Sequence, residues 1–141
     1  MENPIKISSK EERAAWLRQH GVTPTAQRMA VAEVLFSQHD HLCAEEVFER
    51  VTALGQHVSK ATIYNTLSLF VKKGLVREVI ADPARVFYDP NTRPHHHFYD
   101  TETGRLIDID GTHVDVVGLP PLPEGTELEG VDVVVRLRSH G

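Results

Sequence analysis

Three features of the sequence predict an α+β protein built from two parts. Helical periodicity runs through residues 10–75, a hairpin pattern completes the first part at 75–89, and short β-type runs occupy the remainder. The 141 residues, 40 % hydrophobic and 25 % charged, suit a globular chain with one domain of common size or two small ones. We therefore expect a helical N-terminal domain followed by a small α/β, mostly β, C-terminal domain.

The first two helices are bounded by recognisable capping residues. The segment 10–21 ends at Gly21, which is a suitable C-terminal cap. In the segment 23–38, Thr23 is the expected N-cap and Pro24 the first helical residue. These two segments are predicted to be consecutive helices joined by a short turn.

The third and fourth helices are amphipathic. The third, 44–55, gathers its apolar residues on one face: Ala44, Val47, Phe48, Val51 and Leu54. The fourth, 59–75, begins after the cap Ser59, and its expected buried stripe is Ile63, Leu67, Phe70 and Val71. A hairpin follows, with strands at 75–80 and 85–89. Two closely joined helices and a hairpin are the signature of a winged helix-turn-helix.

The outward face of the fourth helix has the residue types that read DNA. Hydrogen-bond donors and a flat hydrophobic side chain near the N-terminal end of such a helix meet base edges and thymine methyl groups. The candidates are Lys60, Thr62, Tyr64 and Asn65. Arg28, near the start of the second helix, suits a phosphate or minor-groove contact. The alternative is an ordinary solvated helix face, but the adjoining hairpin favours double-stranded DNA as the partner.

The C-terminal part has a different texture. Residues 90–94, "PNTRP", read as a linker with two prolines. Short strands are expected at four places: 97–100, 105–109, 113–117 and 131–137. A module of about fifty residues is marginal by itself, so we expect dimerisation or a metal to stabilise it.

Charge and cysteine content narrow the function classes. The net charge is −5, but residues 1–80 carry ten basic against nine acidic residues, while 81–141 carry five against eleven. Only the first part can approach phosphates without strong repulsion. The one cysteine, Cys43, begins the third helix and is read as a small buried residue rather than a ligand. Neither a membrane-length apolar segment nor a secretory signal is visible, so we expect a cytoplasmic protein with no membrane partner.

Nine histidines are the unusual part of the composition. In the run "RPHHHFYD", His95 and His97 point to one face of an extended segment and His96 to the other. Two imidazoles on one face are half of a metal site, which Asp89, Asp108 and His41 could complete if the fold brings them near. Such a His/carboxylate set suits Fe(II), Mn(II) or Zn(II). The alternative is a polar loop without a ligand.

The order of these segments resembles the ferric uptake regulator (Fur) superfamily. "GVTPTAQRMAVAEVL", "HLCAEEVFERV", "VSKATIYNTLSLFVKKGLV", "VFYDPN" and "HHHFYDTETGRLIDI" follow the order of the family over nearly the whole chain. The resemblance implies a homodimeric, metal-responsive repressor that binds palindromic operator DNA. It implies a winged-helix domain at 1–88, a hinge at 89–94 and a metal-sensing dimerisation domain at 95–141. Tyr64 would contact bases.

The resemblance also implies the regulatory metal set: His41, Asp89, His95, His97 and Asp108. Two aspartates, where iron-sensing members commonly have glutamate, are most similar to the PerR-type peroxide sensors. In those proteins bound Fe(II) reacts with peroxide and a ligand histidine is oxidised. His41 and His95 would be the oxidation candidates here. The expected ion is one Fe(II) or Mn(II) per subunit, with Zn(II) possible in a crystal.

Two departures from the family pattern matter. Residues 100–104, "DTETG", stand where members carry a CxxC motif, so no structural zinc is expected. The segment "LPPLPEGTELEG" is proline-rich where many members have a helix. Both features, with the histidine run, also resemble Irr-type regulators that engage haem. Of the family's secondary metal site only His96 has a counterpart, since Pro94 replaces another histidine, and that site is not predicted. The role of His113 is left open.

Three function classes follow. The preferred one is a PerR-like metal-responsive repressor, with an Irr-like haem- or iron-responsive regulator as its alternative. The second is a metalloenzyme, but the sequence supplies no convergent general base or substrate loops, and no small-molecule substrate is expected. The third is a metal-buffering protein without DNA binding.

Overall fold

The computed structural model describes all residues except 1–8, 37–40, 94, 111–112 and 141. The chain divides into two compact units, residues 1–92 and 93–141. Most contacts of each residue are made within its own unit. No helix in the described ranges is long and apolar enough to cross a membrane.

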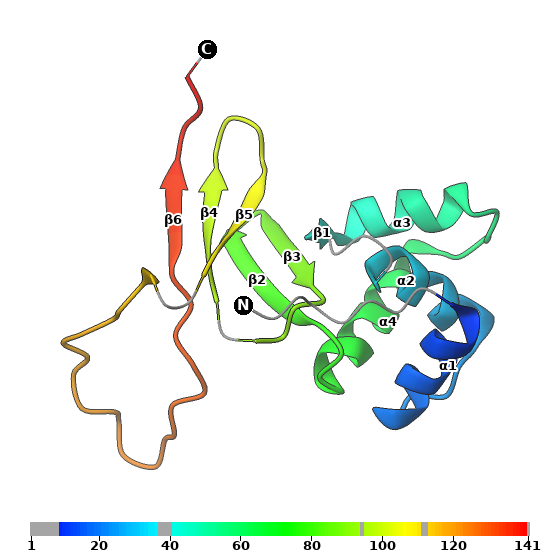
Figure 1. The fold of residues 1–141 in the computed structure, drawn as a ribbon, viewed down its shortest axis with the longest axis horizontal. Helices are drawn as coiled ribbons and strands as arrows, with labels where there is room; N and C mark the ends of the chain where they lie inside the picture. Colours follow the sequence, from blue (N-terminus) through cyan, green and yellow to red (C-terminus); the bar gives the residue numbers. More distant parts are fainter. Residues whose placement is uncertain (1–8, 37–40, 94, 111–112, 141) are drawn as a thin grey trace. The chain divides into compact units, whose positions relative to one another are not determined.

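Unit 1 contains four helices and a three-stranded sheet within its described residues (Figure 1). The helices are α1 (Lys10–Gln19), α2 (Ala26–Phe36), α3 (Ala44–Ala53) and α4 (Lys60–Lys72). The strands are β1 (Leu42–Cys43), β2 (Arg77–Asp82) and β3 (Arg85–Asp89). The strand order is β1-β3-β2, and both pairings are antiparallel. Helices α3 and α4 followed by the β2–β3 hairpin make the predicted winged helix-turn-helix.

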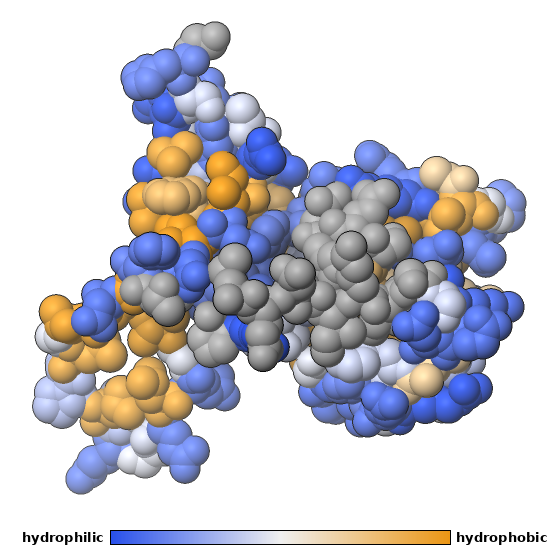
Figure 2. All heavy atoms as spheres, in the orientation of Figure 1, coloured by the Kyte–Doolittle hydropathy of each residue, from blue (hydrophilic) through white to orange (hydrophobic). Residues whose placement is uncertain are grey.

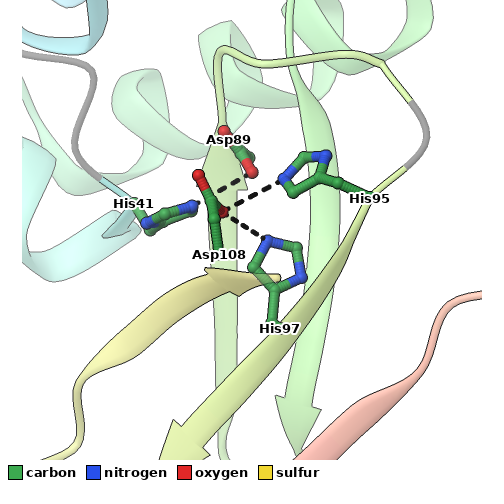
Figure 3. A group of neighbouring side chains, drawn as sticks. All are labelled: His41, Asp89, His95, His97 and Asp108. Carbon is green, nitrogen blue, oxygen red and sulfur yellow. Dashed lines mark ion pairs between the residues drawn. The ribbon is translucent and has the colours of Figure 1, made fainter. Parts of the chain in front are cut away.

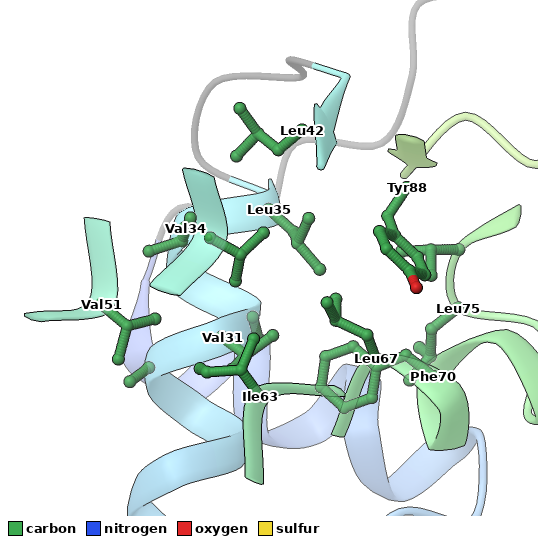
Figure 4. Packing of buried hydrophobic residues seen from close by; sticks show 14 of the residues in the cluster. Val31, Val34, Leu35, Leu42, Val51, Ile63, Leu67, Phe70, Leu75 and Tyr88 are labelled. Carbon is green, nitrogen blue, oxygen red and sulfur yellow. The ribbon is translucent and has the colours of Figure 1, made fainter. Parts of the chain in front are cut away.

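The apolar faces of these elements meet in one core. Figure 4 shows side chains of α2, α3 and α4 converging with Leu42 of β1 and Tyr88 of β3. Phe70 and Leu67 of α4 are fully buried. Burial of a side chain of this size stabilises the fold by roughly 1.5–3 kcal/mol, so α4 is firmly anchored through its inner face. Its other face is left toward solvent.

Local contacts place some helix boundaries differently from the sequence prediction. The N-cap of α2 is not Thr23, because Thr25 Oγ1 accepts the N–H of Arg28 at 3.2 Å and α2 begins only at Ala26. Pro24 therefore precedes the helix. The predicted end of this helix, at residues 37–38, lies outside the described residues. The cap Ser59 is correct, since its Oγ accepts the N–H of Thr62 at 3.1 Å.

Two predicted apolar stripes differ at one position each. In α3, Leu54 is 47 % exposed, because it is the C-cap residue and the helix has already ended. In α4, Thr66 is buried in addition to the predicted residues, and Val71 is only half-buried, although it still packs against the core. The stripe is otherwise as predicted, so both helices have the expected orientation toward the core.

Unit 2 is a three-stranded sheet within its described residues. Its strands are β4 (His96–Asp100), β5 (Leu106–Ile109) and β6 (Val134–Leu137), in the order β5-β4-β6. β5 pairs antiparallel with β4 through the turn at 101–105, and β6 pairs parallel to β4 after the long connection 110–133. Because β5 already returns the chain to the end of the sheet at which β4 begins, this connection leads from β5 past β4 to the start of β6.

The strand predicted at 113–117 is wrong. The described residues 113–133 form no strand, and Figure 1 shows them as an extended, open segment. Pro120, Pro121 and Pro123 lack the N–H that a sheet ladder needs, so the segment that follows 113–117 cannot extend a strand. The predicted strand 131–137 is shorter and begins at Val134.

Candidate metal centre and nucleic-acid interface

Unit 1 pairs a histidine with a carboxylate at the end of its sheet. His41 immediately precedes β1, and Asp89 is the last residue of β3. Because Leu42 lies opposite Tyr88 in the antiparallel pairing, His41 comes beside Asp89. Figure 3 shows the pair, whose His41 Nε2 to Asp89 Oδ2 distance is 3.2 Å. The other carboxylate oxygen, Oδ1, accepts the N–H of Asn91 at 2.9 Å, which orients Oδ2 toward the imidazole.

Unit 2 brings two histidines onto one carboxylate. His97 lies opposite Asp108 in the β4–β5 register, and His95 precedes β4 by one residue. The Nε2 atoms of His95 and His97 lie 3.2 and 3.1 Å from the same Asp108 Oδ1 (Figure 3). The two ring centroids are 4.5 Å apart, with an edge-on arrangement. His95 and His97 therefore lie on one face, as predicted, and both approach the same carboxylate oxygen.

The backbone orients His95. Its Nδ1 lies 2.6 Å from the carbonyl oxygen of Arg93. A carbonyl oxygen only accepts, so Nδ1 carries the hydrogen, and in the neutral ring the Nε2 lone pair faces Asp108. A backbone carbonyl behind a ligating imidazole fixes its tautomer and orientation in metal sites.

The donor types in both groups fit a divalent first-row metal. An imidazole nitrogen and a carboxylate oxygen 3.2 Å apart need a proton or a cation to satisfy both. Imidazole and carboxylate donors suit Fe(II), Mn(II) or Zn(II), and neither group includes a thiolate. The Asp108 side chain is 49 % exposed, so an ion has a route to the unit 2 group.

His96 has a structural contact on the other face. Its Nδ1 accepts the N–H of Val133 at 3.0 Å. This bond ties the residue before β6 to β4 and uses the lone pair of His96 Nδ1. The middle histidine of the run thus differs from its neighbours, as the alternation predicted.

The "DTETG" turn is organised around a carboxylate. Asp100 Oδ1 accepts the N–H groups of Glu102 at 2.9 Å and Thr103 at 3.2 Å, and that of Ser139 at 3.4 Å. The Ser139 hydroxyl donates to Oδ2. This hydroxyl contact is the main reason that the pKa of Asp100 is lowered to about 2, with the backbone N–H groups adding to it. The turn therefore attaches the C-terminal end of unit 2 to β4.

The residues predicted to read DNA lie on or near the outward face of helix α4. Tyr64 is 48 % exposed, and Lys60 and Asn65 are exposed as well. Thr62 is half-buried, and its hydroxyl accepts from Ser59, so it completes the helix cap. These positions leave a donor set and an aromatic ring on the solvent side of α4, as DNA contact requires.

Arg28 lies beside this face. Its Nη1 donates to the carbonyl oxygen of Thr23 at 2.9 Å. A shallow hollow between the start of α2 and α4 is lined by Thr25, Gln27, Arg28, Thr62, Asn65, Thr66 and Leu69. The guanidinium is thereby kept near the N-terminal half of α4.

Two contacts were not predicted from sequence. Lys60 Nζ lies 3.3 Å from Glu45 Oε2 of α3, and Ser139 caps Asp100 from 39 residues away. No local spacing rule relates residues on different helices or at opposite ends of a unit. The sequence shows only that Glu45 and Glu46 lie in the first turn of α3, where acidic residues are favoured by the helix dipole.

The fold and its histidine–carboxylate groups define a class: winged-helix regulators of transcription that respond to a metal ion. The sequence profile of the Ferric uptake regulator family matches residues 19–133. The chain belongs to this family, whose members are transcription regulators that bind operator DNA as dimers, and it is a metal-responsive repressor rather than an enzyme. The metalloenzyme and metal-buffer alternatives are thereby set aside.

Relatives sharpen the assignment. The chain is 35 % identical over 107 residues to the peroxide-responsive repressor PerR of Staphylococcus epidermidis, covering 76 % of this chain and 71 % of that protein. The manganese-containing ferric uptake regulator of Pseudomonas aeruginosa has the same fold, with a TM-score of 0.69, 23 % identity and coverage of 92 % and 98 %. The peroxide stress regulator of Campylobacter jejuni aligns with a TM-score of 0.62, 22 % identity and coverage of 90 % and 96 %. The PerR-like interpretation is the favoured one within the family.

Proposed function

We propose that the chain is a PerR-like sensor in which one Fe(II) or Mn(II) per subunit is bound by His41, Asp89, His95, His97 and Asp108. The observation that carries this proposal is the approach of two imidazole Nε2 atoms to one Asp108 oxygen. The His41–Asp89 pair supplies the remaining ligands. Together they are three neutral nitrogens and two carboxylates, a set that leaves an ion of charge +2 neutralised.

Metal binding is proposed to control the angle between the two units. Two of the five ligands belong to residues 1–92 and three to residues 93–141, with the segment 89–94 as the hinge. Pro94 of this hinge lies outside the described residues. A ligand that needs donors from both units favours the arrangement in which they meet, and this shifts the population of hinge conformations. The DNA-binding surface of each subunit would be set accordingly.

The dimer is proposed to form through the face of the unit 2 sheet that carries Phe98, opposite to the face that carries His97. Phe98 lies opposite Ile107 on one side and Val135 on the other, so these side chains make a row across three strands. They are 36–40 % exposed, and Figure 2 displays hydrophobic atoms over this part of unit 2. β6 is also an edge strand with Leu137 exposed. A second copy covering this face would supply the stabilisation that a sheet of this size needs.

Operator DNA is proposed to meet α4. Tyr64 and Asn65 would contact base edges. Lys60 and Arg28 would bind phosphates, and Thr62, through its contact with Ser59, would keep the start of the helix in place beside the DNA. Two such helices in a dimer would read two half-sites, which explains a palindromic operator.

Peroxide is the proposed signal. Fe(II), when bound, would activate peroxide. One peroxide oxygen would be added to the imidazole of His41 or His95, which supplies the two electrons, and the other oxygen would leave as water. An oxidised imidazole is a poorer ligand, so the metal and then the DNA would be released. The alternative haem response is less well supported, because Nδ1 of His96 is engaged by Val133.

The decisive experiment measures DNA binding by anaerobic protein, apo and loaded with Mn(II), Fe(II) or haem. An operator-length duplex from the promoter of the chain's own gene serves as the first probe. Each sample then receives a short peroxide pulse, followed by mass spectrometry of the peptides that contain His41 and His95. We expect tight binding with Fe(II) that the pulse abolishes, together with oxygen addition, while the Mn(II) form survives. Metal-insensitive binding that haem abolishes, without added oxygen, would refute the peroxide response.

A further inference from the structure

The first turn of α3 places a carboxylate against each of two cations near the DNA-reading helix. Glu45 Oε2 lies 3.3 Å from Lys60 Nζ, and Glu46 Oε1 lies 3.8 Å from Arg85 Nη2 at the hairpin turn. Glu46 also accepts the N–H of Cys43 at 3.1 Å and so has a capping role. Glu45 has no part in that cap, and its side chain is half-exposed. Its contact with Lys60 is therefore separate from that cap.

Lys60 is held on α3 from two sides. Besides Glu45, the ring of Phe48 lies under it, with Nζ 5.5 Å from the ring centroid. Lys60 is the first residue of α4, where the positive end of the helix dipole makes a cation locally unfavourable. A carboxylate and an aromatic face offset this cost. Both partners come from α3, so in the free protein the ammonium group is directed to α3.

We propose that Glu45 sets the affinity of the protein for DNA by holding Lys60 away from the phosphate backbone. This inference rests on the proposed role of the α4 face in DNA binding. While Lys60 is paired with Glu45, its ammonium group has fewer N–H donors and less uncompensated charge to offer a phosphate, and the Glu45 carboxylate also repels the approaching backbone. The result is a lower affinity for DNA of any sequence.

The charge balance explains why one carboxylate matters. Residues 1–80 carry ten basic and nine acidic residues, so their net charge is only +1 and acidic side chains offset most of the attraction to phosphates. Sequence-independent affinity comes almost entirely from such contacts, and each one changes the salt dependence by about 0.9 in log–log slope. A repressor that must leave its operator when the signal arrives benefits from weak background binding. Base contacts by Tyr64 and Asn65 then contribute a larger share of the total.

The experiment is a charge-matched mutant cycle on non-operator DNA. Binding of a mixed-sequence 30-base-pair duplex is measured against salt concentration for wild type, E45Q, K60M and the double variant E45Q/K60M. The control E49Q removes the same charge from the same helix, one turn farther on, where the side chain is exposed. Thermal melting confirms that all five proteins fold.

We expect E45Q to bind roughly tenfold more tightly at low salt, with a slope steeper by about 0.9, because Lys60 becomes free to contact a phosphate. E49Q should show a small gain without a change of slope, and E45Q/K60M should return to the level of E49Q. Equal affinities of E45Q and E49Q, or a gain that persists without Lys60, would overturn the inference.

Failure of the proposed function has a different signature. Wild type is measured in parallel with and without Mn(II) on its operator. Loss of metal dependence there contradicts the sensor but leaves the Glu45 cycle to be judged on its own result. A metal-responsive wild type whose E45Q variant behaves as E49Q removes only the inference about Glu45.

Discussion

Asp100 and Asp108 lie on neighbouring strands of one small sheet, yet their surroundings are opposite. Asp100, at the end of β4, is buried and surrounded by three backbone N–H groups and a hydroxyl. Asp108, in β5, is half-exposed and faces the Nε2 atoms of two histidines. The first carboxylate is satisfied by donors that the chain always carries. The second faces nitrogens that need a proton or a metal ion between them and the oxygen.

Asp100 is therefore a structural carboxylate, whereas Asp108 is the carboxylate that we propose to respond to a metal ion. A carboxylate bound by N–H groups keeps its charge and its contacts whatever the metal concentration. A carboxylate facing imidazoles changes its partner with pH and with metal supply. Asp100 and its donors hold the C-terminal end of unit 2 to β4, whereas the proposed metal ligands of unit 2 lie on the histidine side of the sheet.

The largest effect is expected at the responsive site. His97→Ala should weaken Mn(II) binding by about 100-fold or more, because a ligand is removed from a set whose supporting contacts alone are worth 10- to 100-fold. The metal effect on DNA binding should disappear with it. Titration calorimetry with Mn(II) measures the affinity. His96→Gln is the control, since the amide oxygen can still accept from Val133. Unchanged Mn(II) affinity in His97→Ala would show that the ligand set is wrong.

The next largest effect is expected in unit 1, at the outward face of α4, which lies outside both carboxylate sites of unit 2. Tyr64→Ala should weaken operator binding about tenfold, the usual value of one good base contact, while Mn(II) affinity stays within twofold. Fluorescence anisotropy with labelled operator measures the loss. Tyr64→Phe keeps the ring and serves as the matched control. A parallel loss of Mn(II) affinity in Tyr64→Ala would indicate a folding defect instead of a lost DNA contact.

Removing the charge of the structural carboxylate should lower the stability of the protein and leave its metal affinity nearly unchanged. Asp100→Asn keeps one acceptor oxygen but loses the charge, so the Ser139 hydroxyl and the backbone N–H groups are held less strongly. We expect the Tm to fall by several degrees while Mn(II) affinity changes less than twofold. Asp115→Asn, at an exposed position in the segment 113–133, is the control with the same change of charge. Differential scanning calorimetry of apo protein decides the point.

The smallest effect is a pH dependence confined to strong acid. Because the folded-state pKa of Asp100, about 2, is lower than the ordinary value of 3.8, its contribution is fully present above that value and is lost as the pH falls toward 2. Metal release should come earlier, in mild acid, since ligating imidazoles must be deprotonated. NMR of the Ser139 amide follows the turn. Loss of that signal together with the metal would contradict the separation of the two sites.

Sequence patterns succeeded where a periodic rule applies. The amphipathic stripe of α4 and its cap at Ser59 follow from spacing alone, as does the divergence of His96 from His95 and His97. The same reasoning failed at Thr23, where a neighbouring threonine competed for the cap. It failed again at 113–117, where an alternating pattern is followed by a proline-rich segment and no strand forms.

By itself, therefore, the sequence determined the winged helix, the β-rich second unit and the histidines that face one side, because each depends on residues close along the chain. The tertiary structure decided the β4–β5 register that puts His97 opposite Asp108, the reach of Ser139 to Asp100 and the hold of Glu45 on Lys60. These contacts join residues on different elements. Their geometry arises only when the packing of each unit brings those elements together.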